Sequence, residues 1–175
     1  MIIKSTIIGL GNIGMLYDYK SNKIQTHVKA ILTNKKYSLI GTVEKKKERR
    51  DLLFKKYKIK SFSKLNYSLI LNSSLVVIST STNQLFETIK MIIKINPNTN
   101  ILIEKPFGLK KKEIDFIKKK FITKNRIYVN YYRNFDKSIT TLKKIIIKKF
   151  KGSSYGNLYY TKGFFHNSCH FLAIF

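Results

Sequence analysis

The sequence predicts an α/β fold with a doubly wound parallel sheet, and three observations support this fold class. Strand-like and helix-like segments alternate along all 175 residues. Several of the strand-like segments are continuous apolar runs rich in β-branched residues, which is typical of strands buried on both faces of a parallel sheet. A glycine-rich turn follows the first of these runs. Repeated strand–helix–strand units have right-handed connections and place helices on both faces of the sheet.

Six segments have the composition of strands: Ile2–Ile8, Tyr37–Glu44, Leu75–Thr80, Asn100–Glu104, Arg126–Tyr132 and Tyr155–Thr161. Two apolar stripes at helical spacing predict core-facing helices between them. The first stripe consists of Leu85, Phe86, Ile89, Ile92 and Ile93, and the second of Phe135, Ile139, Leu142 and Ile146. The residues Asn96, Pro97 and Asn98 are expected to end the first of these helices.

The composition is that of a globular and strongly basic chain. Hydrophobic residues make up 43% of the sequence, and the formal net charge is +26. The lysines are spread along the chain rather than gathered in one arm, so we interpret most of them as parts of solvated helix faces. A nucleic-acid partner is the alternative. It is disfavoured because the sequence has no helix-turn-helix pattern and no recognisable aromatic platform for single strands.

Three features of the sequence favour a cytoplasmic protein without a membrane partner. The N-terminal segment lacks the long apolar stretch and the cleavage site of a signal peptide. Apolar runs such as Leu75–Ile78 are too short to cross a bilayer. The single cysteine, Cys169, cannot form an internal disulfide, which fits a reducing compartment.

The segment TIIGLGNIGMLY places Gly9, Gly11 and Gly14 in a G-x-G-x-x-G pattern directly after the first strand. The first glycine permits a tight turn, the second lets a pyrophosphate approach the backbone, and the third lets the next helix pack closely on the strand. Asn12 and Ile13 begin that helix, whose free N–H groups carry partial positive charge. The motif predicts a dinucleotide-binding turn, although glycine turns also end strands for structural reasons alone.

The second expected strand ends at Glu44. A carboxylate at this tip can accept hydrogen bonds from both hydroxyls of an adenosine ribose, which favours NAD over the 2′-phosphorylated NADP. The adjacent Lys45 and Lys46 weaken that preference, so NADP is kept as an alternative cofactor. A second alternative is that Glu44 only caps its strand.

Two further segments carry side chains suited to chemistry. Glu104 and Lys105 close a buried strand, at the edge where open α/β sheets bind ligands. His166 and His170 stand four residues apart beside Cys169, and residues at this spacing share a helix face. A structural zinc site usually needs four ligands, so we predict no metal here and interpret Cys169 as a small buried hydrophobe.

In these segments the sequence resembles the glucose–fructose oxidoreductase, inositol dehydrogenase and MocA-like (Gfo/Idh/MocA) family of NAD(P)-dependent oxidoreductases. The likeness covers nearly the whole chain: the glycine turn at 9–14, YDY at 17–19, the TH-KA stretch at 26–30, the acid at 44, VVISTSTN at 76–83, EKP at 104–106, NYYR at 130–133 and KGFFHNSCH at 162–170. A similar His-Asn-x-Ser-His stretch occurs in members found with sugar metabolism and cell-surface polysaccharide biosynthesis.

The resemblance implies a Rossmann-type dinucleotide-binding domain over residues 1–124. Residues 125–175 would then hold a sixth strand, a linking helix and the incomplete start of an α+β substrate domain. Ser79, Thr80, Glu104 and Lys105 are implied in cofactor binding, in addition to the glycine turn and Glu44. The implied reaction is oxidation of a sugar or nucleotide-sugar hydroxyl by hydride transfer to the nicotinamide.

The resemblance also implies catalytic roles. Lys105 would contact the nicotinamide ribose and the reacting hydroxyl, and His170 would be the acid/base that takes the hydroxyl proton. His166 lies where many relatives have an aspartate. A neutral histidine suits proton transfer because its unperturbed pKa lies near working pH.

The sequence departs from the family pattern at two positions that edge the cofactor pocket. Ser81 and Leu85 stand where relatives usually have proline and histidine, so we expect weaker nicotinamide contacts. The family continues into a large antiparallel sheet, of which only the first helix and strand are expected here. We therefore expect no measurable turnover from this chain alone. A non-catalytic nucleotide-binding remnant, and half of a split enzyme completed by a second chain, are the alternatives.

Overall fold

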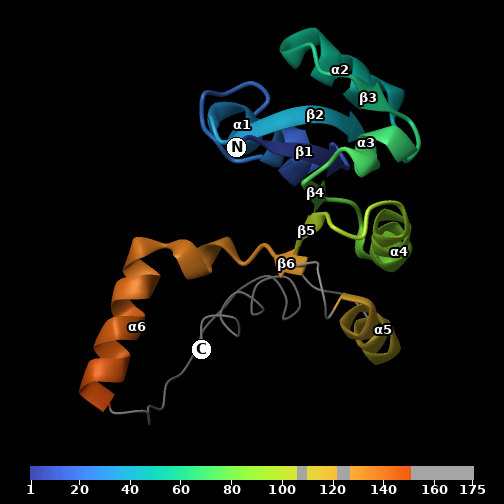
Figure 1. Cartoon of the computed structure of the whole chain (residues 1–175). Coiled ribbons are helices and arrows are strands. Elements are labelled where there is room, and N and C mark those ends of the chain that lie inside the picture. The colour runs from blue at the N-terminus through green and yellow to red at the C-terminus, as the bar shows by residue number, and fades with distance from the viewer. Residues whose placement is uncertain (106–109, 122–126, 151–175) are drawn as a thin grey trace.

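The computed structural model describes residues 1–105, 110–121 and 127–150. Its centre is one sheet of six strands: β1 (Ile3–Ile8), β2 (Tyr37–Val43), β3 (Ser61–Phe62), β4 (Leu75–Ile78), β5 (Asn100–Ile103) and β6 (Ile127–Val129). The strands lie in the order β3-β2-β1-β4-β5-β6, and every neighbouring pair is parallel (Figure 1). The predicted doubly wound Rossmann-type fold is therefore confirmed.

Helices cover both faces of this sheet. The helical elements are η1 (Asn12–Leu16), α1 (His27–Thr33), α2 (Lys47–Tyr57), α3 (Tyr67–Leu71), η2 (Thr82–Gln84), α4 (Leu85–Ile95), α5 (Lys111–Phe121), η3 (Tyr132–Phe135) and α6 (Lys137–Phe150). Side chains of α1 and α2 pack with Ile7 of β1 in one buried cluster. Side chains of α3, α4 and α5 pack with Ile8 in another. Adjacent residues of β1 thus point to opposite faces, as the period of a strand requires.

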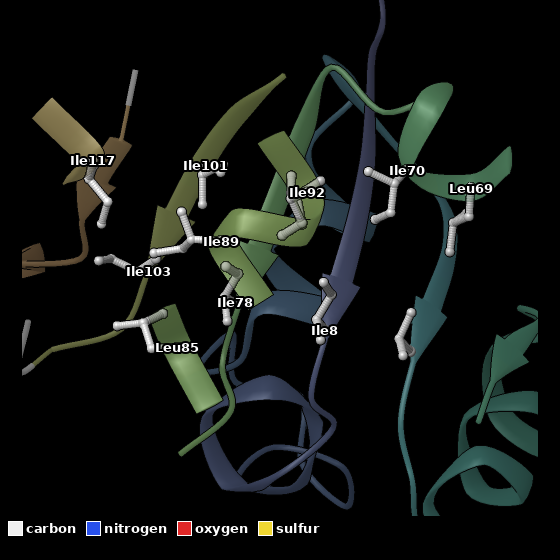
Figure 2. Close-up of a cluster of buried hydrophobic side chains, with 12 residues drawn as sticks. Ile8, Leu69, Ile70, Ile78, Leu85, Ile89, Ile92, Ile101, Ile103 and Ile117 are labelled. Carbon is white, nitrogen blue, oxygen red and sulfur yellow. The ribbon is translucent and has the colours of Figure 1, made fainter. Parts of the chain in front are cut away.

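The larger cluster lies between the sheet and α4. Ile78 and Ile103 of the sheet face Leu85, Ile89 and Ile92 of α4, as Figure 2 shows. Burial of one such side chain stabilises the fold by about 1.5–3 kcal/mol relative to its exposure. The first predicted apolar stripe is confirmed as core-facing, with Phe86 and Ile93 packed at its margin.

Five of the expected strands are present among the described residues, each with ends trimmed by up to three residues. β3 was not expected, because two residues are too short for a periodic signal. The sixth expected strand, Tyr155–Thr161, lies outside the described residues. So does the predicted domain boundary at 124, which stays a prediction.

The expectation that the second stripe faces a core is wrong for the described residues. Phe135 is 84% exposed and Leu142 is 44% exposed, while Ile139 and Ile146 are only half-buried. The reason is topological: α6 follows the edge strand β6 and extends away from the sheet (Figure 1). Helical spacing indicates which face of a helix is apolar, but not whether another layer covers it.

Within the ranges that the structure describes, no helix has both the length and the apolar content needed to span a membrane.

Candidate functional site

A groove of about 960 Å³ opens at the carboxyl ends of β1, β2 and β4. Chain connections leave β1 and β4 toward opposite sides of the sheet, so this is the switch point at which open α/β sheets bind ligands. The predicted residues Gly9, Gly11, Glu44, Ser79 and Thr80 all line the groove. One face of α4 forms its far wall.

The floor of the groove is the glycine turn after β1. Gly9 has φ +97°, a left-handed conformation that favours glycine, and a Cβ here would lie 2.9 Å from the backbone carbon and oxygen of Ser79. The Ser79 hydroxyl donates a hydrogen bond of 2.7 Å to the Gly9 carbonyl oxygen. The turn is therefore locked against the end of β4.

The two other glycines of the motif have different surroundings. A Cβ on Gly14 would lie 2.3 Å from the Gly9 carbonyl oxygen, so this position requires glycine for packing. A Cβ on Gly11 would meet only the Arg49 guanidinium, at 3.7 Å. The backbone at Gly11 is thus open toward the groove, and an anionic group could approach it there.

The helical segment that starts at Asn12 is short. η1 has five residues and π-type hydrogen bonds, such as the bond of 3.1 Å from Leu16 N–H to the Gly11 carbonyl oxygen. A loop then leads to α1, and the buried Asp18 holds it by accepting hydrogen bonds from Gln25 N–H and from both the N–H and the hydroxyl of Thr26. The helix dipole behind the glycine turn is accordingly that of one helical turn only.

Glu44 is 7% exposed and joins the glycine turn to the turn that follows β2. Its Oε2 accepts a hydrogen bond of 2.6 Å from Leu10 N–H, and its Oε1 accepts one of 2.9 Å from Lys46 N–H. The Arg49 guanidinium lies 3.5 Å from Oε2. A capping role is the alternative to ribose binding at this position. The capping contacts are present, and ribose binding stays a prediction.

A second polar cluster lies at the ends of β5 and β6. His27 Nε2 is 2.6 Å from Glu104 Oε1, and Asn130 Nδ2 donates a hydrogen bond of 2.6 Å to the same oxygen. Burial alone would raise the pKa of Glu104, but these two hydrogen bonds and the nearby charges of His27 and Lys105 hold it below its ordinary value. Glu104 therefore stays ionised near neutral pH and ties α1 to two strands.

Sequence reasoning gave His27 and Asn130 no role in this cluster. They lie 77 and 26 residues from Glu104 along the chain, so only the topology brings the three together. The EKP and NYYR segments are both parts of the family resemblance, but the resemblance does not indicate that they contact each other.

The other predicted residues fall in three places. Lys105 is half-buried and directly follows Glu104. Ser81 lines the groove, whereas Leu85, the first residue of α4, does not line it: its side chain is 3% exposed and packs in the core. His166, Cys169 and His170 lie outside the described residues. Within residues 1–105, 110–121 and 127–150 no three His, Cys, Asp or Glu side chains are grouped to hold a metal ion, and the prediction of no metal at the histidines stays untested.

Solved structures share this architecture. One is a myo-inositol 2-dehydrogenase from Lactobacillus plantarum, with a TM-score of 0.70 and 18% sequence identity. Another is a scyllo-inositol dehydrogenase from Lactobacillus casei with bound NAD(H) and scyllo-inositol, with a TM-score of 0.69 and 18% identity. Each alignment covers 87% of this chain but only 43% of the solved chain, so the chain spans less than half the length of these structures.

No curated protein matches the chain in sequence, but a family model does. The sequence pattern of an oxidoreductase family with an NAD-binding Rossmann fold, the Gfo/Idh/MocA family, matches residues 3–132. That range contains the glycine turn, Glu44 and the Glu104 cluster, and it is well over half of the chain. The chain therefore belongs to the Gfo/Idh/MocA family of oxidoreductases.

Proposed function

We propose that the chain binds a nicotinamide dinucleotide in the groove at the switch point. The pyrophosphate lies against the open backbone of Gly11, at the start of η1, and the adenosine extends toward Glu44. One observation carries this proposal: Gly11 is the position of the turn where a side chain would clash with no backbone, so glycine there serves a ligand rather than the fold. Ser79 and Thr80 at the end of β4 complete the site.

The substrate class is also proposed. Family membership and the likeness to inositol dehydrogenases support a polyol or sugar hydroxyl as the reacting group. The His-Asn-x-Ser-His resemblance supports the narrower choice of a sugar or nucleotide sugar in cytoplasmic polysaccharide biosynthesis.

The proposed roles of the side chains follow from the family resemblance and, for Lys105, also from its place just after β5. Bound nicotinamide would supply the hydride acceptor. Lys105 orients the reacting hydroxyl, His170 accepts its proton, and His166 assists from the same segment. The clamp of His27 and Asn130 on Glu104 fixes the backbone at the end of β5, and hence the point from which Lys105 extends. An error of about an ångström in such placement can cost on the order of a hundredfold in rate.

The decisive test is a calorimetric titration of NADH and of NADPH into the chain and into its Gly11→Val variant. The variant should keep the melting temperature, because a Cβ at Gly11 meets only the end of a flexible arginine. It should lose at least about tenfold in affinity for both cofactors, since the side chain occupies the phosphate position. Equal affinity of the variant and the original chain, or no binding by either, would refute the proposal.

Turnover is tested separately with a panel of inositols, sugars and UDP-sugars. NADH formation that disappears in Lys105→Ala would support the catalytic role of Lys105, and NADH formation that persists in the variant would refute it.

A further inference from the structure

The rim of the groove beside Glu44 is strongly cationic. Lys45 and Lys46 follow the tip of β2, Lys64 comes from the loop after β3, and Arg49 comes from α2; all four line the groove. The three lysines have no carboxylate partner among the described residues. Most lysines of this basic chain lie on solvated faces, but these converge from two separate loops on one cavity.

The carboxylate that would repel an anion here is already neutralised. Glu44 accepts hydrogen bonds from Leu10 N–H and Lys46 N–H, and the Arg49 guanidinium lies 3.5 Å away. Its lone pairs are largely used within the protein, and its charge is matched by one adjacent cation. Counting Lys45, Lys46 and Lys64, the local balance near the tip of β2 is positive.

The turn that presents the lysines is held in shape. Arg50 Nη1 donates hydrogen bonds of 2.9 Å to the Glu44 carbonyl oxygen and 2.7 Å to the Lys45 carbonyl oxygen. These bonds fix the backbone of Lys45, whose exposed side chain lines the groove. The Arg49 guanidinium lies 3.5 Å from Glu44 Oε2 and 3.7 Å from the position that a Cβ on Gly11 would take. The four cations thus line one groove, beside the glycine turn and the tip of β2.

We infer that this rim is a subsite for a phosphate on the 2′-position of the adenosine ribose, so that the groove takes NADP(H) at least as well as NAD(H). The inference rests on the proposed dinucleotide function and specifies its ligand. An arginine near the end of β2 is the residue type that accommodates this phosphate in Rossmann folds. Guanidinium groups bind phosphate through paired hydrogen bonds, and ammonium groups add point charge.

The test separates this subsite from the general attraction of a basic chain for anions. Calorimetry at physiological ionic strength compares 2′,5′-ADP with 3′,5′-ADP, two ligands of equal charge that differ only in the position of one phosphate. NAD⁺ and NADP⁺ are titrated in parallel. We expect 2′,5′-ADP to bind about tenfold more tightly than 3′,5′-ADP, the effect of one well-made charged contact, and NADP⁺ to bind at least as tightly as NAD⁺.

Two variants and one control locate the effect. Arg49→Ala and, on a different loop, Lys64→Ala should each reduce the advantage of 2′,5′-ADP several-fold while NAD⁺ binding changes less. Lys47→Ala removes an equal charge from the same turn, but Lys47 pairs with Asp51 and does not line the groove, so it should have no effect. Melting curves check that each variant is folded, and Lys64→Ala keeps the test valid if Arg49→Ala unfolds.

Three outcomes would overturn the inference. Equal binding of the two ADP isomers would mean that the rim attracts anions without a defined subsite. NAD⁺ bound with NADP⁺ excluded would refute the inference and leave the proposed function intact. If neither dinucleotide binds, both proposals fail.

Discussion

Two regions of the molecule differ in how completely they are built: the nucleotide end, around the central strands β1, β2 and β4, and the far end, beyond the edge strand β6. Around β1, β2 and β4, apolar side chains fill both faces, and buried polar groups such as Glu44 and Asp18 have several hydrogen-bond partners. Beyond β6, large apolar side chains face solvent, with Phe135 84% exposed and Ile147 71% exposed. The nucleotide end is complete within the described residues. The far end carries apolar surface that those residues do not cover.

The first prediction tests whether the nucleotide end is as closely packed as this comparison requires. Gly14→Ala places a Cβ 2.3 Å from the Gly9 carbonyl oxygen, a backbone atom that cannot move without opening the turn. We expect the free energy of unfolding to fall by about 3 kcal/mol, the upper range for overpacking a core. Urea denaturation measures the change.

Gly11→Ala is the matched control, because the same methyl group enters open space there. The control should change stability by less than about 0.5 kcal/mol, as surface substitutions usually do. If Gly14→Ala were as stable as Gly11→Ala, the close approach of η1 to the first turn would be refuted.

The second prediction concerns the bridge made by Glu44. In Glu44→Gln, the amide has one oxygen for the two backbone N–H groups that the carboxylate now accepts, so one buried donor loses its partner. Leaving such a group unpaired costs about 1–3 kcal/mol. Thermal denaturation should show this loss, whereas Glu48→Gln, on the exposed first turn of α2, should leave stability unchanged. Equal melting temperatures for both variants would mean that the bridge contributes nothing.

The third prediction uses the depressed pKa of Glu104. A carboxyl whose pKa is lower in the folded than in the unfolded state stabilises the fold above its unfolded value, and that contribution is lost as pH falls through the folded value. The chain should therefore lose stability relative to Glu104→Gln as pH falls below the ordinary pKa of 4.5. A pKa difference of one between the folded and unfolded states corresponds to about 1.4 kcal/mol, so even a modest difference is measurable by urea denaturation.

The measurement compares urea midpoints between about pH 5.5 and pH 3, below the range in which unperturbed histidines titrate. The groups that face Glu104 are His27 of α1, Asn130 after β6 and the adjacent Lys105. A constant difference between the chain and Glu104→Gln across this window would show that Glu104 does not titrate with a depressed pKa.

Local features of the site were predictable from sequence, and long-range ones were not. The conformation of Gly9 and the packing of Gly14 follow from a motif of six residues. The position of Glu44 follows from one strand end, but its bond to Leu10 requires the sheet order. The contacts of Glu104 with His27 and Asn130 require three elements to meet, and no local pattern encodes this. Helical periodicity failed at α6 for a related reason, since it carries no information on what packs against the helix.

The smallest expected effect is at α6, and it tests the comparison from its other side. Ile147→Gln replaces a side chain that is 71% exposed with a residue of similar length and good helix propensity. If the far end is as open as the structure indicates, the free energy of unfolding should change by less than about 0.5 kcal/mol. Ile89→Ala, at a fully buried position of α4, should by contrast cost about 2–5 kcal/mol.

A loss above about 2 kcal/mol for Ile147→Gln, in the range of a core substitution, would mean that this side chain is covered in solution. Measuring this loss of stability at several protein concentrations would then show what covers the side chain. Cover by a second copy of the chain weakens on dilution, whereas cover by residues of the same chain does not depend on concentration.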